Sequence, residues 1–187
     1  MRRAIFGGTF DPIHKAHVVM AREAADAFSL DQVLLIPAGN PPHKAAGAAY
    51  EHRFRMVELA CSGDRRLVAS RLEEGREKSY SILTIERVKA EGGDVFFIIG
   101  ADAFAEIQTW FRWQEVVREA EFIVVTRPGH GYESPPGARV HRLDSVVLPV
   151  SSSEIRERLA RGEMPEEVPE AVAGYIRQQG LYSEKVR

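Results

Sequence analysis

The feature that constrains the fold most is a set of short apolar runs that alternate with segments of helical periodicity. The runs cover residues 4–6, 33–36, 95–99, 122–126 and 146–150, and a further short strand is expected at 67–70. Runs of this length and composition are typical of buried strands. Strands that alternate with helices favour a parallel sheet covered on both faces. The sequence therefore predicts an α/β fold, with a Rossmann-like, doubly wound, mostly parallel sheet and helices on both faces.

Length, charge and cysteine content narrow the class of protein. A chain of 187 residues suits one domain, so we expect a single domain over 1–187. The net charge of −2 gives no general field for nucleic acid, and we expect no such partner. The only cysteine, Cys61, excludes an intrachain disulfide and fits a reducing compartment. No apolar stretch resembles a secretory leader or a membrane span, so we expect a cytoplasmic protein without a membrane partner. A homo-oligomer is left open.

The first apolar run leads into a glycine turn and then a helix. We expect Gly7 and Gly8 to end the strand by adopting backbone angles that a β-carbon forbids, and Asp11-Pro12 to make the turn. From about Ala16 onward apolar residues recur at spacings of three and four, which predicts a helix with an inward apolar face. The unpaired N–H groups and the dipole at a helix start attract phosphate, and neighbouring glycines let it approach the backbone.

Two histidines, His14 and His17, stand at this predicted helix start. Residues three apart share one face of a helix, and each imidazole can donate a hydrogen bond to a phosphate oxygen. A zinc site is an alternative, although no glutamate stands at the metalloprotease spacing and the chain has one cysteine. Two ordinary surface histidines are a third interpretation.

Two more loops follow predicted strands at the same edge of the sheet. Ligands in open α/β sheets bind beyond the carboxyl ends of the strands. Asn40 could there contact a ribose or a base edge, and Lys44 a phosphate, unless the loop is only a rigid proline connector with a solvated charge. Asp102, which follows Gly100, could accept hydrogen bonds from a ribose diol or could be a helix N-cap.

Two predicted helices begin with serine-rich segments. The first opens at 79–81, where free N–H groups suit a carboxylate or a phosphate and plain capping is the alternative. The second starts at a capping box formed by Ser151 and Glu154. The residues left at its amino end are Ser152, Ser153 and Arg156. An arginine there is commonly solvated, but it can also bind two phosphate oxygens.

These segments resemble a known family. Residues 7–17 read G-G-T-F-D-P-I-H-K-A-H, which is similar to the nucleotidyltransferase superfamily and most closely to bacterial nicotinate-nucleotide adenylyltransferases, with the motif G-[GS]-[TS]-F-D-P-[IV]-H-x-G-H. Ala16 replaces the usual glycine and adds a methyl group where a triphosphate passes. Weaker matches are N-P-P-H-K at 40–44 and I-G-A-D…W over 99–110, and V-S-S-S-E-I-R at 150–156 matches the family's I-S-S-[TS]-x-I-R. The resemblance covers nearly the whole chain.

The resemblance implies transfer of the AMP group of ATP to nicotinate mononucleotide, giving nicotinate adenine dinucleotide and pyrophosphate in NAD biosynthesis. It implies Mg²⁺ carried by the nucleotide, and no metal site made by the protein. The residues it places at the phosphates are His14, His17, Lys44 and Arg156. Those it places at ATP are Gly8, Thr9, Phe10, Gly100, Asp102, Ser152 and Ser153. Those it places at the mononucleotide are Asn40, Ser81, Ile82, Trp110 and Phe111.

Within these sets we assign roles. We hypothesise that His17 and Arg156 stabilise the charge on leaving pyrophosphate and that His14 orients the phosphates. By resemblance Trp110 is a platform for the pyridine ring, whereas Trp113 is expected to be ordinary packing. The main-chain N–H groups near Ser81, Ile82 and Phe111 are the expected ligands of the nicotinate carboxylate.

Two other functions stay open. One is another nucleotidyltransferase of the superfamily, with nicotinamide mononucleotide or phosphopantetheine as acceptor; Trp110 and the Asn40 loop favour a pyridine nucleotide. The other is a nucleotide sensor without turnover. The presence of His14, His17 and Arg156 together argues against a sensor, which needs no help at a leaving group. All of this requires the two ends of the chain to meet at one site.

Overall fold

A computed structural model describes residues 1–40, 46–145 and 150–183. Its strands are β1 (Arg2–Gly8), β2 (Gln32–Pro37), β3 (Leu67–Ala69), β4 (Asp94–Gly100), β5 (Glu121–Thr126) and β6 (Arg139–Asp144). Its helices are α1 (Lys15–Ala27), α2 (Tyr50–Cys61), α3 (Ser81–Ala90), α4 (Ala101–Ala105), α5 (Trp113–Glu119), α6 (Ser152–Ala160) and α7 (Glu170–Gln179), with a 3₁₀ turn η1 (Ile107–Thr109). Within the described ranges, none of the helices has the length and apolar character needed to cross a membrane.

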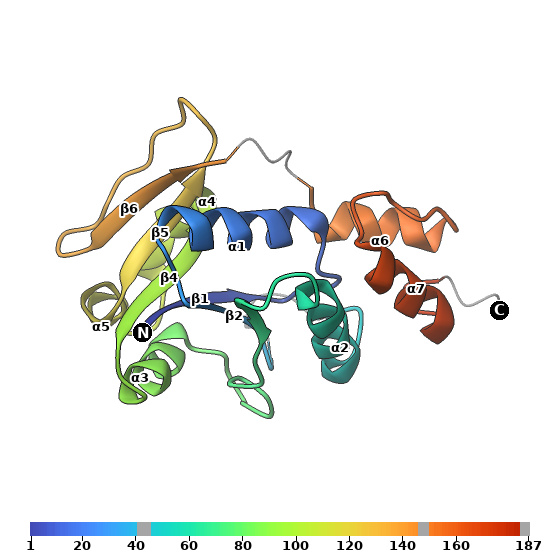
Figure 1. Ribbon diagram of the computed structural model, residues 1–187, viewed down its shortest axis with the longest axis horizontal. Coiled ribbons are helices and arrows are strands. Elements are labelled where there is room, and N and C mark those ends of the chain that lie inside the picture. The colour runs from blue at the N-terminus through green and yellow to red at the C-terminus, as the bar shows by residue number, and fades with distance from the viewer. Residues whose placement is uncertain (41–45, 146–149, 184–187) are drawn as a thin grey trace.

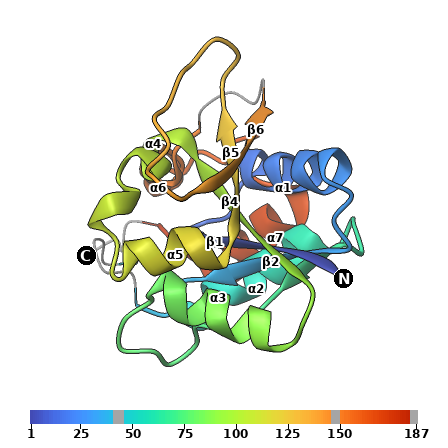
Figure 2. The same cartoon turned by 90° about the vertical axis from the view of Figure 1, so that its left-hand side faces the viewer.

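The described strands form one sheet in the order β3-β2-β1-β4-β5-β6, and every neighbouring pair is parallel. Helix α1 lies on one face of this sheet, and α3 and α5 lie on the other (Figures 1 and 2). This confirms the predicted Rossmann-like, doubly wound architecture. The order of the strands reverses between β1 and β4, and in such sheets the crevice for a ligand opens at this reversal.

The alternation of side chains along each strand divides the core into two layers. On β1, Ala4 and Phe6 enter the layer under α1, whereas Ile5 enters the layer under α3 and α5. On β5, Ile123 and Phe122 divide in the same way. Successive side chains of a strand point to opposite faces, so a run that is apolar throughout is buried on both. The continuous apolar runs of the sequence therefore fix a sheet with two covered faces.

The two edges of the sheet are short or charged. Strand β3 has only three residues, and β6 exposes Arg139, Arg142 and Asp144. The sequence placed the last strand at 146–150, whereas the strand found here is β6, Val150 lies outside any strand, and 146–149 lie outside the described residues. That prediction missed β6 because an edge strand, paired on one side only, needs no continuous apolar run.

The glycine turn after β1 also differs from expectation. Gly7 and Gly8 are the last residues of β1, and the left-handed backbone belongs to Phe10, with φ of 49°. A β-carbon on Gly8 would lie 3.1 Å from the Phe10 ring, so this glycine makes room for the ring to fold back. A β-carbon on Gly7 would meet no atom within 4 Å, so the backbone there is open to approach. Gly8 thus allows the Phe10 ring to pack closely, and Gly7 leaves the main chain open to a ligand.

Candidate active site

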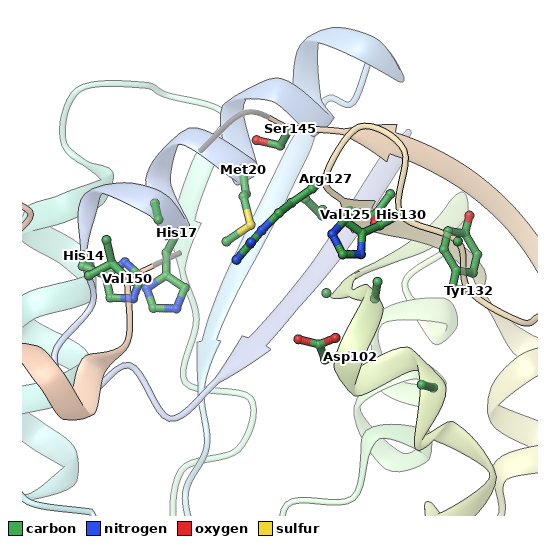
Figure 3. Close-up of a pocket in the computed structure, with 16 residues that line it drawn as sticks. His14, His17, Met20, Asp102, Val125, Arg127, His130, Tyr132, Ser145 and Val150 are labelled. Atoms are coloured by element: carbon green, nitrogen blue, oxygen red, sulfur yellow. Dashed lines mark hydrogen bonds between the residues drawn. The ribbon is translucent and has the colours of Figure 1, made fainter. Parts of the chain in front are cut away.

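A cavity of about 530 Å³ lies at the carboxyl end of the sheet, between the segments that follow β1, β4 and β5. His14 and His17 line one side of it, and Arg127 reaches in from another side, with Asp102 nearby (Figure 3). Gly100 also lines it. The cavity sits where the strand order reverses, which is the position expected for a ligand site in this fold.

The two histidines form one stacked unit at the start of α1. Their ring centroids are 3.7 Å apart with an interplanar angle of 23°. The His14 N–H donates to Nδ1 of His17 at 3.2 Å, so a neutral His17 carries its proton on Nε2. The His17 ring is also held edge to face by Phe10, with centroids 5.1 Å apart, and by Phe6 at 6.0 Å. His17 therefore presents an Nε2–H donor from a fixed ring.

Burial keeps both histidines uncharged in the free protein. It lowers the pKa of His14 to about 4, against a smaller opposing effect of the Glu167 charge. The pKa of His17 falls well below its ordinary value, first through burial and then through His14. His14 is 3 % exposed and its buried Nδ1 has no hydrogen-bond partner among the described residues, so it is not an ordinary surface histidine. His17 is half-buried and packs against Phe6 and Phe10. Within the described ranges, no group of three or more metal-ligating side chains is found.

The amino end of α6 is built as predicted. The Ser151 hydroxyl accepts a hydrogen bond from the Glu154 N–H at 3.0 Å, and the Glu154 carboxylate accepts one from the Ser151 N–H at 3.3 Å. This reciprocal capping box fixes where the helix begins. It thereby places the residues of the first turns of α6.

Those residues bring the two ends of the chain together. The Ser152 hydroxyl donates to the Pro12 carbonyl at 3.1 Å, and Nη1 of Arg156 donates to the Asp11 carbonyl at 2.7 Å. Nη2 of Arg156 donates to the Ser153 hydroxyl at 3.3 Å. The start of α6 accordingly lies beside the start of α1 (Figure 1). These three α6 residues do not line the cavity itself; they adjoin the loop that carries His14.

The predicted ATP residues at the ends of β1 and β4 differ in which of their groups can meet a ligand. Gly100 is the N-cap of α4, and Asp102 lies exposed in its first turn, so the N-cap alternative for Asp102 is wrong. The Phe10 ring is buried against His17, so only its main chain can meet a ligand. The Thr9 carbonyl accepts a hydrogen bond from buried Arg53 at 2.7 Å, and Gly8 leads into this turn.

The predicted mononucleotide residues gather around the start of α3. The Ser79 hydroxyl accepts hydrogen bonds from the N–H of Gly39 at 3.0 Å and of Asn40 at 3.4 Å. The Asn40 amide nitrogen also donates to the Glu77 carbonyl at 2.8 Å. A β-carbon on Gly39 would lie 1.9 Å from the Glu73 carbonyl, so this close approach requires glycine. Lys44, in the same loop, lies outside the described residues.

An aromatic pair extends this region. Phe111, which is 50 % exposed, stacks on Tyr80 with centroids 4.4 Å apart. Tyr80 is the N-cap of α3, so the stack brings Phe111 beside Ser81 and Ile82, the first residues of that helix. The Ile82 side chain is fully buried and leaves only its main chain for a ligand.

The two tryptophans lie against the same core layer. Trp110 is partly buried, edge to face with Phe97 of β4, with centroids 5.8 Å apart. Trp113 is also partly buried against this layer, as expected for a packing residue. Trp110 keeps a partly exposed surface, so it can serve both packing and binding.

Several residues of the cavity were not identified from the sequence. Arg127, His130 and Tyr132 line it, and Arg127 points its guanidinium toward the centre (Figure 3). Arg127 directly follows β5 and could have been found by the strand-end rule that identified Asp102. His130 stands in a loop rich in glycine and proline, where no pattern distinguishes it from a surface residue. These groups place hydrogen-bond donors opposite the stacked histidines.

Comparison with known proteins places this chain in a family. The cytidylyltransferase-like family model matches residues 5–158. A relative from Solibacter usitatus named "Probable nicotinate-nucleotide adenylyltransferase" is 56% identical over 188 residues, which cover 98% of this chain and 100% of that protein. A protein of the same name from Thermus thermophilus is 39% identical over 186 residues, which cover 97% of this chain and 100% of that one.

A solved structure shows the same fold. The Plasmodium falciparum nicotinic acid mononucleotide adenylyltransferase complexed with NaAD matches with a TM-score of 0.84 at 18% identity, over 100% of this chain and 99% of that one. The sequence relatives, the family model and the strand order agree with the resemblance of residues 7–17 and 150–156. The chain therefore belongs to the nicotinate-nucleotide adenylyltransferase family of cytidylyltransferase-like nucleotidyltransferases.

Proposed function

We propose that this protein transfers the AMP group of ATP to nicotinate mononucleotide, and releases pyrophosphate and nicotinate adenine dinucleotide. The observation that carries the proposal is the stacked pair His14 and His17 at the amino end of α1, with Arg156 hydrogen-bonded to the same loop. The proposal is supported by the position of the histidines in the lining of a cavity at the reversal of the strand order, with the Arg156 cation bonded to the adjoining loop. Such a site suits the binding and displacement of phosphates.

The reaction needs no general base. An oxygen of the mononucleotide phosphate attacks the α-phosphorus of ATP, and the bond from that phosphorus to the oxygen bridging to the β-phosphorus breaks. The second ionisation of a phosphate monoester has a pKa of about 6, so the acceptor is already largely dianionic at neutral pH. The electron pair of the broken bond stays on pyrophosphate. The protein's task is therefore alignment for in-line attack and stabilisation of the charge on the leaving group.

The groups on this chain are suited to that task. His17 offers its Nε2–H from a ring fixed by Phe6 and Phe10, and His14 lies face to face with it. We assign leaving-group stabilisation to His17 and Arg156, and orientation of the phosphates to His14. Arg156 has five N–H donors, and only one on each Nη is used in the described bonds to Asp11 and Ser153. Lys44 is proposed as a further cation near the phosphates.

Mg²⁺ fits this site as a companion of the nucleotide. It prefers oxygen ligands, and ATP supplies them from its phosphates. Among the described lining residues Asp102 is the one carboxylate, and we assign it to the ribose. The buried Asp11 carboxylate already accepts hydrogen bonds from Gly47, Ala48 and Tyr182. When bound, Mg²⁺ neutralises phosphate charge. Gly8, Thr9, Phe10, Gly100, Ser152 and Ser153 complete the proposed ATP contacts.

The acceptor is proposed to bind between the Asn40 loop and the start of α3. Free N–H groups at the first turn of a helix attract a carboxylate, and Ser81 and Ile82 occupy that turn of α3. The exposed Phe111 and the partly exposed Trp110 lie beside it and can cover a pyridine ring. A neutral amide in place of the carboxylate loses this charge-assisted interaction. This arrangement favours nicotinate over nicotinamide.

Pyrophosphate release from ATP tests the proposal directly. We expect turnover with nicotinate mononucleotide, at least about tenfold lower kcat/KM with nicotinamide mononucleotide because hydrogen bonds to a charged group are lost, and none with phosphopantetheine. Equal or greater turnover with phosphopantetheine would assign the chain to another acceptor. ATP binding without turnover of any of the three would indicate a sensor.

Replacement of Trp110 tests the acceptor site. We expect Trp110→Ala to raise the KM for nicotinate mononucleotide about 5- to 30-fold, since aromatic stacking on a base contributes about 1–3 kcal/mol and part of this ring already packs on Phe97. The KM for ATP should stay within about twofold. Trp113→Ala is the matched control, because it removes the same side chain from the same layer. If both variants only lower the melting temperature, Trp110 is a packing residue alone.

A further inference from the structure

A tyrosine far from the phosphate motifs in sequence is bonded to the loop that carries them. Tyr182 follows α7 in a left-handed backbone conformation, with φ of 63°, that non-glycine residues seldom adopt. Its hydroxyl donates to Oδ1 of Asp11 at 2.7 Å. Burial and this bond raise the pKa of Tyr182, so the hydroxyl stays protonated and remains a donor at any pH of interest. The hydrogen bond from the Tyr182 side chain to Asp11 holds the backbone in this unfavourable conformation.

Asp11 is the point at which four segments meet. Its side chain is buried, and its carboxylate accepts hydrogen bonds from the N–H of Gly47 at 2.6 Å and of Ala48 at 3.1 Å. Nη1 of Arg156 lies 3.7 Å from Oδ2 of Asp11 but donates to the Asp11 main-chain carbonyl at 2.7 Å. The Asp11 carboxylate thus accepts its hydrogen bonds from Tyr182 and two main-chain N–H groups. The hydrogen bond of Arg156 goes to the main-chain carbonyl of Asp11 instead.

The packing around Gly47 shows how closely these groups are fitted. A β-carbon there would lie 3.2 Å from Oδ2 of Asp11, 3.2 Å from Cδ of Arg156 and 3.5 Å from Cε1 of Tyr182. The space between the three side chains therefore accommodates only a glycine without a shift. A change in the position of one of them displaces the others, because well-packed groups transmit displacement.

We propose that Tyr182 is a positioning residue for phosphate binding, which keeps the ion pair between the Asp11 carboxylate and the guanidinium of Arg156 at its long distance of 3.7 Å. With the hydroxyl in place, Asp11 has its hydrogen bonds and Arg156 can turn its remaining N–H groups to phosphate oxygens. Without the hydroxyl, Oδ1 lacks one donor in a buried place, where an unpaired charge is costly. The guanidinium of Arg156 is already 3.7 Å from Oδ2, so it can move closer to Asp11 and pair with it more tightly, in competition with the ligand.

This inference rests on the proposed function for the role of Arg156, and its test uses a ligand that does not depend on the acceptor. Calorimetry measures the affinity of pyrophosphate in the presence of Mg²⁺ for wild type, Tyr182→Phe, Arg156→Ala and the double variant. We expect Tyr182→Phe to bind about tenfold more weakly, as for one hydrogen bond to a charged group. In the Arg156→Ala background the same change should have no further effect, because the residue through which it acts is gone.

Tyr175→Phe is the matched control. Tyr175 also lies near the end of the chain, on α7, and its hydroxyl is 2.9 Å from Nδ1 of His52 on α2. This variant should bind pyrophosphate within twofold of wild type, and thermal unfolding of both phenylalanine variants separates loss of fold from loss of position. Wild-type affinity in Tyr182→Phe, or an equal loss with and without Arg156, would overturn the inference. Failure of nicotinate mononucleotide as acceptor would refute the proposed function and leave this result standing.

Discussion

Replacement of His17 by alanine should reduce kcat by about 10²–10³-fold, the usual loss when one pre-positioned donor to a developing charge is removed. The His17 ring is fixed by Phe6, Phe10, His14 and the His14 N–H, so its Nε2–H is directed before substrate binds. A donor that acts mainly on the leaving pyrophosphate affects the transition state more than the ground state. The KM for ATP should therefore change by less than kcat. Steady-state release of pyrophosphate measures both.

The control is another histidine with a defined partner. His52 on α2 lies 2.9 Å from the Tyr175 hydroxyl, outside the described cavity lining. His52→Ala should keep kcat within about twofold, because the half-buried His52 side chain contacts Tyr175 and does not line the cavity. If His17→Ala turns over near the wild-type rate with ATP binding unchanged, its assignment to the leaving group is wrong. If ATP binding falls as much as turnover, His17 serves ground-state binding instead.

The stacked histidines should also make the stability of the free protein depend on pH. Burial lowers the pKa of His14 from 6.5 to about 4 and lowers that of His17 as well. Between pH 6.5 and about 4 the unfolded chain binds a proton on His14 that the folded chain does not. The contribution of His14 to the free energy of unfolding is therefore fully present above pH 6.5 and is lost as the pH falls. For His14 this loss amounts to about 2 kcal/mol at pH 5. His17 adds to it in the same direction.

Urea unfolding of wild type and His14→Asn at pH 8 and pH 5 measures this effect. Asparagine is a good N-cap, so the variant keeps the helix start while removing the titrating group. We expect wild type to lose about 2 kcal/mol more than the variant between the two pH values. An equal loss of unfolding free energy in wild type and His14→Asn would show that His14 is already protonated in the folded protein at pH 5. Saturation with ATP should reduce the difference, because bound phosphate favours the charged imidazole.

The fold could be predicted from the sequence because a buried parallel sheet has a strong pattern. Runs such as 95–99 and 122–126 are apolar throughout since both faces of their strands are covered, and the helices between them fix parallel pairing. The amino end of α6 could be predicted because its capping box is a local interaction between two residues, Ser151 and Glu154, three positions apart. Edge strand β6 was missed because its stability comes from pairing with β5, which leaves no periodic signal of its own.

The site was predictable where a residue stands at a recognisable strand end or helix start, although Arg127, which follows β5, was missed. Asp102 lies beyond the end of β4, where the strand-end rule placed it, and His14 and His17 lie at the start of α1, where the helical periodicity placed them. The left-handed backbone was expected at Gly7 and Gly8 but occurs at Phe10, whose buried ring packs edge to face against His17. The hydrogen bond between Tyr182 and Asp11 joins residues 171 positions apart, so no local sequence pattern predicts it.

The borders of the sheet restrict how copies of this protein could associate. An uncovered strand is a template for another chain, and proteins block it with short strands and charged side chains. Here β3 has only three residues, and β6 carries the charged side chains of Arg139, Arg142 and Asp144. Extension of the sheet from one molecule into the next is therefore disfavoured on both sides. A quaternary assembly would have to be built from helical or loop surfaces, which leaves the crevice and its strand ends outside any intermolecular ladder.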